Sequence, residues 1–204
     1  MCMLEKPAVC RLALITALYF LTITTATPAV SAATTATAAT ANAPAIPGKL
    51  AEPPALLLPV QGVAASALRD TFDEGRDNKS RGHEAIDIAA PRGTPVLAVD
   101  DGRIVKLFLS KPGGITLYQF DKTGQFAYYY SHLDRYAEGL AEGQTMRRGS
   151  VIGYVGSTGN ARPDAPHLHF AIFRLAPDKK WWQGEPLNPF SYLGGQKPQL
   201  LLKK

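Results

Sequence analysis

The segment APHLHFAIF, residues 165–173, decides the fold prediction. Successive side chains of a β-strand point to opposite faces of the sheet, so His167 and His169 lie on the same face, one pleat apart. The other face is apolar and is predicted to face the core; it consists of Leu168, Phe170 and Ile172. The segment is therefore predicted to be a strand that buries one face and presents two imidazoles on the other.

Further strand-like segments with glycine-rich turns precede it. Residues 94–109 carry an Asp-Gly turn between two strand-like runs, and PGG, residues 112–114, separates these runs from ITLYQFD, residues 115–121. The tripeptide KTG then leads to FAYYYSHL, residues 126–133. Short strands at this rhythm, without long amphipathic helices, predict an all-β domain with an antiparallel sheet or sandwich rather than βαβ units.

The chain contains only four histidines, and their spacing indicates a metal site. His83 stands four residues before Asp87, and His132 follows an aromatic run. Zinc prefers nitrogen and oxygen ligands, and a catalytic site supplies three protein ligands while leaving the fourth position to water. His83, Asp87 and one histidine of the 167/169 pair meet that count. The two remaining imidazoles could move protons or stabilise the oxygen of an attacked carbonyl.

The alternation within residues 126–133 gives a prediction for the surroundings of His132. It places His132 on one face with Phe126, Tyr128 and Tyr130, at the end of an aromatic wall, and Tyr129 and Ser131 on the other face. We interpret the three tyrosines as ordinary strand aromatics. A tyrosine hydroxyl near the site could bond to substrate, but none is assigned a catalytic role.

Four segments, in order and spacing, resemble the M23 zinc metallopeptidases, a family that includes lysostaphin-like and LytM-like murein endopeptidases. They are GHEAIDIAAPRGTPVLAVDDGRIV (82–105), YYYSHL (128–133), RRGSVIGYVGSTG (147–159) and APHLHFAIF (165–173). The resemblance extends from about Phe72 to Leu193 and implies a narrow groove that is floored by the sheet, walled by loops and holds zinc at its base. The polar residues 70–82 could form one wall of this groove or an occluding loop.

Carried over residue by residue, the resemblance implies that His83, Asp87 and His169 bind zinc and that His132 and His167 are the catalytic histidines. All five positions are intact, which argues against the degenerate, metal-free members that activate other enzymes. The family's usual H-x-G-x-D reads H-E-A-I-D here. This change keeps both ligands and affects only the conformation of the neighbouring loop.

Two other motifs resemble parts of the chain and are set aside. His83-Glu84 begins like the H-E-x-x-H helix of another zinc peptidase class, but the proline- and glycine-containing residues 91–95 break any helix, so Glu84 is predicted to face solvent. Residues 143–159 resemble the hairpins of biotin- and lipoyl-carrier domains, but they have no lysine at a hairpin tip. A carrier without its attachment lysine cannot function as a carrier.

Residues 1–32 are predicted to be a secretory leader. Lys6 and Arg11 precede the apolar run LALITALYFLTIT, and small residues follow for cleavage after Ala32. The run is short for a membrane span, with an uncleaved anchor extending to Val30 as the alternative. The chain is therefore expected to be secreted, periplasmic or associated with the cell envelope, and to have no stable membrane span after cleavage.

The rest of the chain is predicted to form a linker, one domain and a tail. Residues 33–55, rich in alanine, threonine and proline, are predicted to be a flexible linker, and residues 194–204 a flexible tail. Residues 56–193 suffice for one substantial core and are predicted to be a single M23-like peptidase domain. Cys2 and Cys10 both lie in the leader, so neither disulfides nor thiolate zinc sites are expected in the mature chain.

The charge of the chain agrees with a cell-wall partner. The formal net charge of +5 becomes +4 when the leader, with two basic residues and one acidic residue, is removed. This modest basicity suits a polyanionic surface, and without a dense basic run there is no case for nucleic acid.

The sequence thus predicts a secreted zinc metalloendopeptidase that hydrolyses peptide bonds in peptidoglycan cross-links or stem peptides, with Zn²⁺ as cofactor and with any protein activator unidentified. One alternative is a catalytically silent peptidoglycan-binding module or an activator of a partner hydrolase. Another is a zinc peptidase or amidase with a different substrate, such as a glycine-rich protein. The choice between D-alanyl-diaminopimelate and glycyl bonds depends on loops that carry no recognisable motif.

Overall fold

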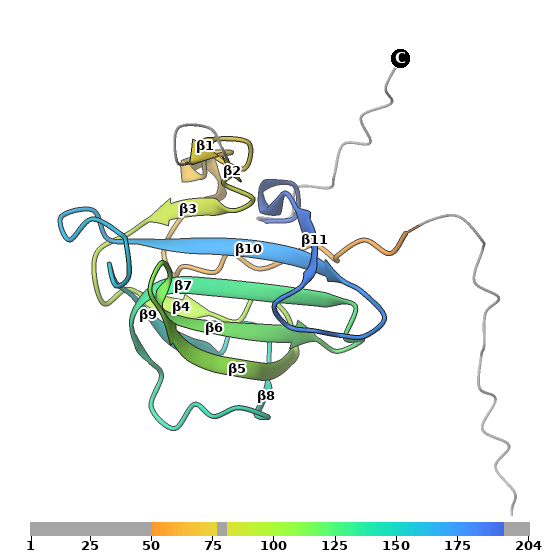
Figure 1. Cartoon of the computed structure of the whole chain (residues 1–204). Helices are drawn as coiled ribbons and strands as arrows, with labels where there is room; N and C mark the ends of the chain where they lie inside the picture. The colour runs from red at the N-terminus through yellow and green to blue at the C-terminus, as the bar shows by residue number, and fades with distance from the viewer. Residues whose placement is uncertain (1–49, 77–80, 194–204) are drawn as a thin grey trace, which may run out of the picture. The chain divides into compact units, whose positions relative to one another are not determined.

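A computed structural model describes residues 50–76 and 81–193, and its strands pair in an antiparallel manner throughout the named ladders. The main sheet follows the order β11-β10-β7-β6-β5-β8, with β3 on β10 and with β9 joining β4 to β7 (Figure 1). Its strands are β3 (Ile86–Ala89), β4 (Pro95–Leu97), β5 (Gly102–Ser110), β6 (Gly114–Asp121), β7 (Phe126–Tyr136), β8 (Thr145–Met146), β9 (Val151–Val155), β10 (His167–Leu175) and β11 (Gly184–Leu187). The prediction of an all-β, antiparallel fold is confirmed.

The remaining elements are short. A separate hairpin joins β1 (Gly75–Arg76) to β2 (Arg81–Gly82) and lies beyond β3 at the top of Figure 1. Two 3-10 turns, η1 (Ala65–Ala67) and η2 (Pro189–Ser191), are the helical elements of the described ranges. No helix within these ranges has the length and apolar character needed to cross a membrane.

Part of the predicted linker contacts the domain. Arg174 donates hydrogen bonds to the carbonyl of Ala51 (3.0 Å) and to the carboxylate of Glu52 (3.1 Å), and the hydroxyl of Tyr192 also bonds to Glu52. The buried Leu56 then forms a parallel bridge with Leu193. The leader, the linker up to residue 49 and the tail lie outside the described residues, and their boundaries stay predictions.

The sheet forks around its two central strands. One edge of β10 pairs with β7, while the other edge pairs with β3 through its first residues and with β11 through its last residues. In the same way, one edge of β7 pairs with β10 and then, near the end of the strand, with β9, while the other edge pairs with β6. As a result, the amino-terminal half of β10 lies between β3 and β7, which brings three sequence-distant segments side by side (Figure 1).

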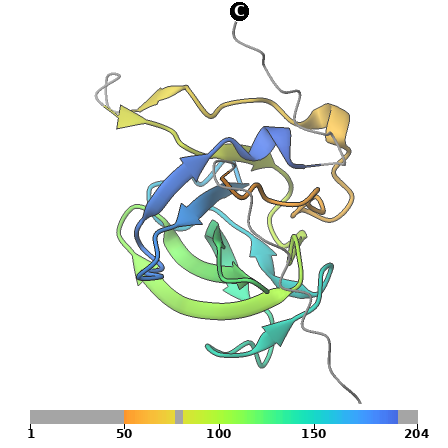
Figure 2. The ribbon, with the colours of Figure 1, turned by 90° about the vertical axis from the view of Figure 1, so that its right-hand side faces the viewer.

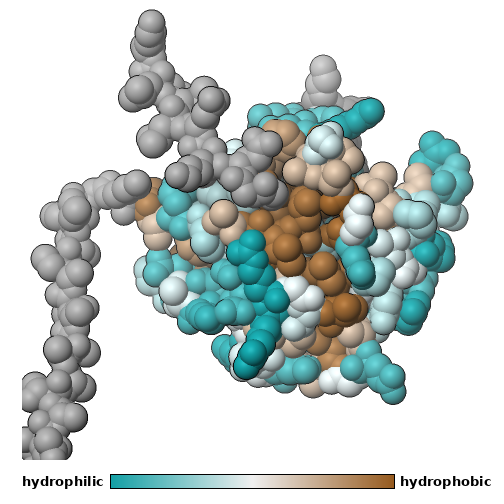
Figure 3. Space-filling model, turned by 180° about the vertical axis from the view of Figure 1, so that it is seen from behind, coloured by the Kyte–Doolittle hydropathy of each residue, from teal (hydrophilic) through white to brown (hydrophobic). Residues whose placement is uncertain are grey.

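The core lies against the inner face of the curved sheet, and Figure 2 shows the long β5 bending around it. Leu168, Phe170 and Ile172 are fully buried, as the alternation in β10 predicts. A band of apolar side chains also reaches the surface on the side opposite to the view of Figure 1 (Figure 3).

The predicted face of His132 is wrong. Tyr128 and Tyr130 are fully buried in the core, whereas His132 lines a groove on the other side together with Tyr129 and Ser131. The reason is an irregularity in β7: His132 has a φ of 60°. The pairing of β7 with β6 shifts register between Tyr130 and Leu133, and the pairing with β9 shifts directly after Leu133. A bulge interrupts the two-residue alternation and redirects the histidine.

The turn at Asp101-Gly102 separates two strands, as predicted. The two runs that it separates become β4 and β5, but these strands do not pair with each other as a hairpin. Instead, β4 pairs with β9 and β5 pairs with β6. The PGG and KTG turns separate strands, as predicted, and each of these turns connects two strands that pair with each other.

A buried hydrogen-bond chain holds the centre of the sheet to the segment after β4. The hydroxyl of Tyr130 accepts a hydrogen bond from the Val99 N–H (3.1 Å) and donates one to Gln119 Oε1 (2.9 Å). Gln119 Nε2 in turn donates to the carbonyl of Asp100 (2.7 Å). Tyr130 and Gln119 are completely buried, so no water can replace a lost partner.

We therefore predict that Tyr130→Phe lowers the free energy of unfolding by about 1–3 kcal/mol, because it leaves a buried donor and a buried acceptor without partners. Urea denaturation measures this change. Tyr118→Phe is the matched control, since the Tyr118 hydroxyl makes no hydrogen bond with a described residue and its loss should be nearly neutral. Equal destabilisation by the two variants would contradict the role of the chain.

Candidate active site

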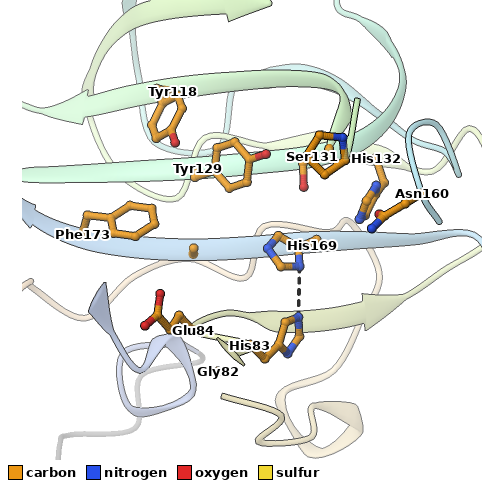
Figure 4. A pocket seen from close by; sticks show the side chains of 13 residues that line it. Gly82, His83, Glu84, Tyr118, Tyr129, Ser131, His132, Asn160, His169 and Phe173 are labelled. Carbon is orange, nitrogen blue, oxygen red and sulfur yellow. Dashed lines mark hydrogen bonds between the residues drawn. The ribbon is translucent and has the colours of Figure 1, made fainter. Parts of the chain in front are cut away.

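Three side chains from different parts of the chain converge at one point. His83 follows β2, Asp87 lies on β3, and His169 lies on β10 directly opposite Asp87 in the strand register. His83 Nε2 lies 3.0 Å from His169 Nδ1 and 3.1 Å from Asp87 Oδ1, and His169 Nδ1 lies 3.0 Å from the same oxygen. Three potential ligand atoms thus form a nearly equilateral triangle, and Figure 4 shows the two histidines facing each other.

The hydrogen bonding of His83 fixes which nitrogen faces the other two residues. Its Nδ1 lies 2.9 Å from the carbonyl oxygen of Thr71, which can only accept, so Nδ1 carries the proton. In the neutral ring, Nε2 then directs a lone pair at Asp87 and His169. A converging set of imidazole and carboxylate lone pairs is an arrangement that a cation stabilises.

The spacing and chemistry of these atoms fit zinc. A tetrahedral zinc site with bonds of about 2.0–2.1 Å separates its ligand atoms by about 3.3 Å. The observed separations of 3.0–3.1 Å are close to that value. Two imidazoles and one carboxylate are also a donor set found in catalytic zinc sites, so His83, Asp87 and His169 could hold the metal.

Thr71 supports two of these residues at once. Besides the contact of its carbonyl with His83, its hydroxyl oxygen accepts a hydrogen bond from the backbone N–H of Asp87 (3.2 Å). Thr71 therefore sets the ring orientation of one ligand and the backbone position of another. Sequence reasoning missed this residue because its spacing from His83, 12 positions, matches no local motif.

Asp87 remains ionised in this environment. Burial alone would raise the pKa of its carboxyl, but the close polar contacts with the imidazoles of His169 and His83 outweigh burial and hold the pKa well below its ordinary value. The carboxylate therefore supplies a negative charge at the convergence point at any pH near neutrality.

The other two histidines lie beside the triangle. The ring centroid of His132 is 4.9 Å from that of His167 and 5.7 Å from that of His169, and His167 Nε2 lies 3.8 Å from Asp87 Oδ1. All five predicted site residues are thus brought into one cluster. Their individual roles stay predictions.

Backbone carbonyls orient both of these imidazoles. Nδ1 of His132 donates to the carbonyl of Thr158 (2.8 Å), and Nδ1 of His167 donates to that of Ala165 (2.9 Å). In each ring the Nε2 atom is left as the one that can accept a proton. Burial also lowers the pKa of His132 to about 4, so this ring is neutral at pH 7.

A groove of about 360 Å³ runs along the sheet from these histidines (Figure 4). Its described lining comes from six places: the segment around β2, the β5–β6 turn, the strands β6, β7 and β10, and the loop after β9. The residues are Gly82, His83, Glu84, Pro112, Gly113, Tyr118, Tyr129, Ser131, His132, Asn160, His169, Ala171 and Phe173. Residues 70–82 therefore contribute to one wall through Gly82.

The groove contains residues to which the sequence analysis assigned no role. Ser131 is 1% exposed, and its hydroxyl has no hydrogen-bond partner among the described residues. Tyr129 places its ring edge toward His169, with centroids 6.0 Å apart. Glu84 is exposed, as predicted, but it also lines the groove. Regular alternation along β7 predicts Tyr129 and Ser131 on the face opposite to His132. The bulge at His132 places all three residues on the same side.

The chain is similar to known peptidases. The model of the family described as Peptidase family M23 matches residues 81–189. Among curated proteins, DD-carboxypeptidase/endopeptidase Mpg of Neisseria meningitidis is 40% identical over 110 residues, which cover 53% of this chain and 22% of that protein. L-Ala--D-Glu endopeptidase of Bacillus subtilis is 31% identical over 131 residues, which cover 61% of this chain and 39% of that protein.

Solved structures agree with this similarity. The catalytic domain of lysostaphin from Staphylococcus simulans superposes with a TM-score of 0.51 and 26% identity, covering 63% of this chain and 93% of that domain. Csd3 of Helicobacter pylori gives a TM-score of 0.53 and 28% identity over 69% of this chain and 35% of that one. The match therefore extends over nearly all of an isolated catalytic domain, but over only about a fifth to two fifths of the two curated relatives.

We predict that Thr71→Val weakens zinc binding by about tenfold or more, because the Asp87 N–H loses the hydroxyl that positions it. Thr71→Ser is the matched control, since it keeps the hydroxyl and should bind zinc nearly as tightly as the unaltered chain. Competition with a chromophoric zinc chelator measures the affinities. A Val variant that binds zinc as tightly as the Ser variant would contradict this role.

Proposed function

The chain belongs to peptidase family M23, and we propose that it is a zinc-dependent endopeptidase that cuts peptide bonds in the cross-links or stem peptides of peptidoglycan. The observation that carries the proposal is the convergence of two imidazole nitrogens and one carboxylate oxygen, all 3.0–3.1 Å apart, at the end of a groove. The activities after which the relatives from Neisseria meningitidis and Bacillus subtilis are named support the substrate class. The predicted leader, residues 1–32, would deliver the enzyme to the cell envelope.

His83, Asp87 and His169 would hold the zinc ion. When bound there, zinc supplies Lewis acidity, which polarises a peptide carbonyl and makes water a better nucleophile. Asp87 contributes the charge that keeps the ion in place, and the contact with Thr71 keeps the lone pair of His83 directed at it.

His132 and His167 would transfer protons and stabilise the oxyanion. Their Nδ1 protons are engaged by backbone carbonyls, so each presents Nε2 to the reaction. A neutral His132 can accept a proton from the attacking water at Nε2 and release it to the leaving amine, and its lowered pKa favours that release. A protonated or hydrogen-bonded second imidazole would stabilise the negative oxygen of the tetrahedral intermediate.

The groove would bind the peptide on either side of the cleaved bond. Ser131 lines the groove beside His132, but its hydroxyl is enclosed, so we assign it no contact with the substrate. Tyr129 forms the floor beside His169 and would exclude water from the reacting atoms.

We predict that the purified chain, loaded with zinc, releases newly uncross-linked peptides from cross-linked murein. A strong chelator should abolish the release, and added zinc should restore it. Mass spectrometry of the new termini would identify the bond. Full zinc occupancy without cleavage would contradict the enzyme proposal and favour the alternative of a binding module or activator.

We also predict that the five site residues separate into two groups. His132→Ala and His167→Ala should lower turnover by at least about 100-fold while one zinc ion remains bound. His83→Ala, Asp87→Asn and His169→Ala should lose the metal itself. Zinc content by elemental analysis and turnover on murein measure the two effects, with Asp164→Asn, at an exposed aspartate paired with Arg162, as the control. Equal zinc loss in both groups would refute this division.

A further inference from the structure

The end of the groove away from His132 is lined by aromatic rings. Tyr118 of β6, Tyr129 of β7 and Phe173 of β10 lie next to one another on its floor (Figure 4). The ring centroid of Tyr118 is 4.7 Å from that of Tyr129 and 6.5 Å from that of Phe173. We name these three residues the aromatic floor.

Further aromatic rings pack against Tyr118 of the aromatic floor. Trp181 packs on Tyr118, with centroids 5.1 Å apart, and on Phe108, at 5.4 Å. Burial raises the pKa of the Tyr118 hydroxyl, so this ring remains neutral over the physiological range. The floor therefore offers rigid, uncharged π faces.

A single carboxylate faces this floor. Glu84 lies on the wall formed by the segment between β2 and β3, and its carboxylate points toward β10, between His169 and Phe173 (Figure 4). Its φ of 55° is rare for a residue with a side chain, and its N–H is held by the carbonyl of Phe72 (3.0 Å). The backbone is thus fixed in an unusual conformation that directs this side chain over the groove.

The charge of Glu84 is not neutralised by the described residues. Its carboxylate makes no hydrogen bond or ion pair with any of them, and the described lining of the groove contains neither lysine nor arginine. Neutral aromatic faces beside a carboxylate without a counter-ion are the two components that recognise an ammonium group, one by cation–π attraction and the other by charge.

We propose that Glu84 and the aromatic floor form a subsite for a substrate ammonium group, namely the free amine on the side chain of a diamino acid near the cleaved bond. This inference rests on the proposed peptidase function and selects among its substrates: a stem peptide with a diamino acid fits the subsite, whereas a run of glycines has no side-chain amine to place there. An apolar side chain would fit the rings but would leave the carboxylate unpaired.

Two synthetic branched peptides test the subsite. They contain the same diamino acid beside the cleavable bond and differ only in whether its free amine is acetylated. We expect the full-length, zinc-loaded chain to hydrolyse the free-amine peptide with a kcat/KM about 5–10-fold higher. Glu84→Gln should remove this preference by slowing only the free-amine peptide. Glu138→Gln, at an exposed glutamate outside the groove lining, is the matched control and should retain it.

Binding supplies a second readout that does not require turnover. Calorimetry in a His132→Ala background, with and without Glu84→Gln, should show that the free-amine peptide binds about 5–10-fold more tightly only when Glu84 is present. Such binding without hydrolysis by the unaltered chain would overturn the peptidase function and leave the subsite standing. Three results would overturn the subsite and leave the peptidase function standing. They are hydrolysis of both peptides at equal rates, a preference for the acetylated peptide, and an equal effect of Glu84→Gln on the two peptides.

Discussion

The antiparallel pairing of β10 with β3 on one edge and with β7 on the other is the constraint on which the site depends. In this register His169 lies opposite Asp87 on one side and opposite Ser131 on the other. A slip of one residue would turn His169 toward the core and Leu168 toward the groove. The buried face of β10, with its fully buried Leu168, Phe170 and Ile172, opposes such a slip, so hydrophobic packing on one face fixes the metal-binding geometry on the other.

The bulge in β7 directs His132 into the groove, which a regular strand could not do. A left-handed conformation at a non-glycine residue costs of order 1–3 kcal/mol and persists only where its surroundings enforce it. Here the N–H of His132 donates to the carbonyl of Gly113 (2.8 Å), and its ring donates to Thr158. A Cβ on Gly114 would approach Thr158 Oγ1 to 2.2 Å, so the β5–β6 turn meets the loop after β9 too closely for a side chain there. This contact holds the bulge.

The sequence is sufficient to predict the parts of the site that follow local periodicity or a family motif. The His-x-His alternation correctly predicts the buried face of β10, and the resemblance selects five residues that the structure brings together. The alternation fails at His132 because a bulge depends on contacts with two other loops. The sequence also does not predict the support from Thr71 or the position of Glu84 over the groove. Both depend on contacts between segments distant in the chain, such as that of the Thr71 hydroxyl with the Asp87 N–H.

The two ends of the groove carry charges of opposite sign in the proposed complex. A doubly charged zinc ion held by one carboxylate and neutral imidazoles leaves one formal positive charge at the histidine end, while the unneutralised Glu84 leaves one negative charge beside the aromatic floor. Glu84 is exposed, so water and salt screen part of its field, but both charges lie along the same groove. A peptide with a carbonyl near the first end and an ammonium near the second would be aligned by both. The direction of the bound chain would then be set by electrostatics before any side-chain packing contributes, which is how an open groove of small volume could select one orientation of a flexible substrate.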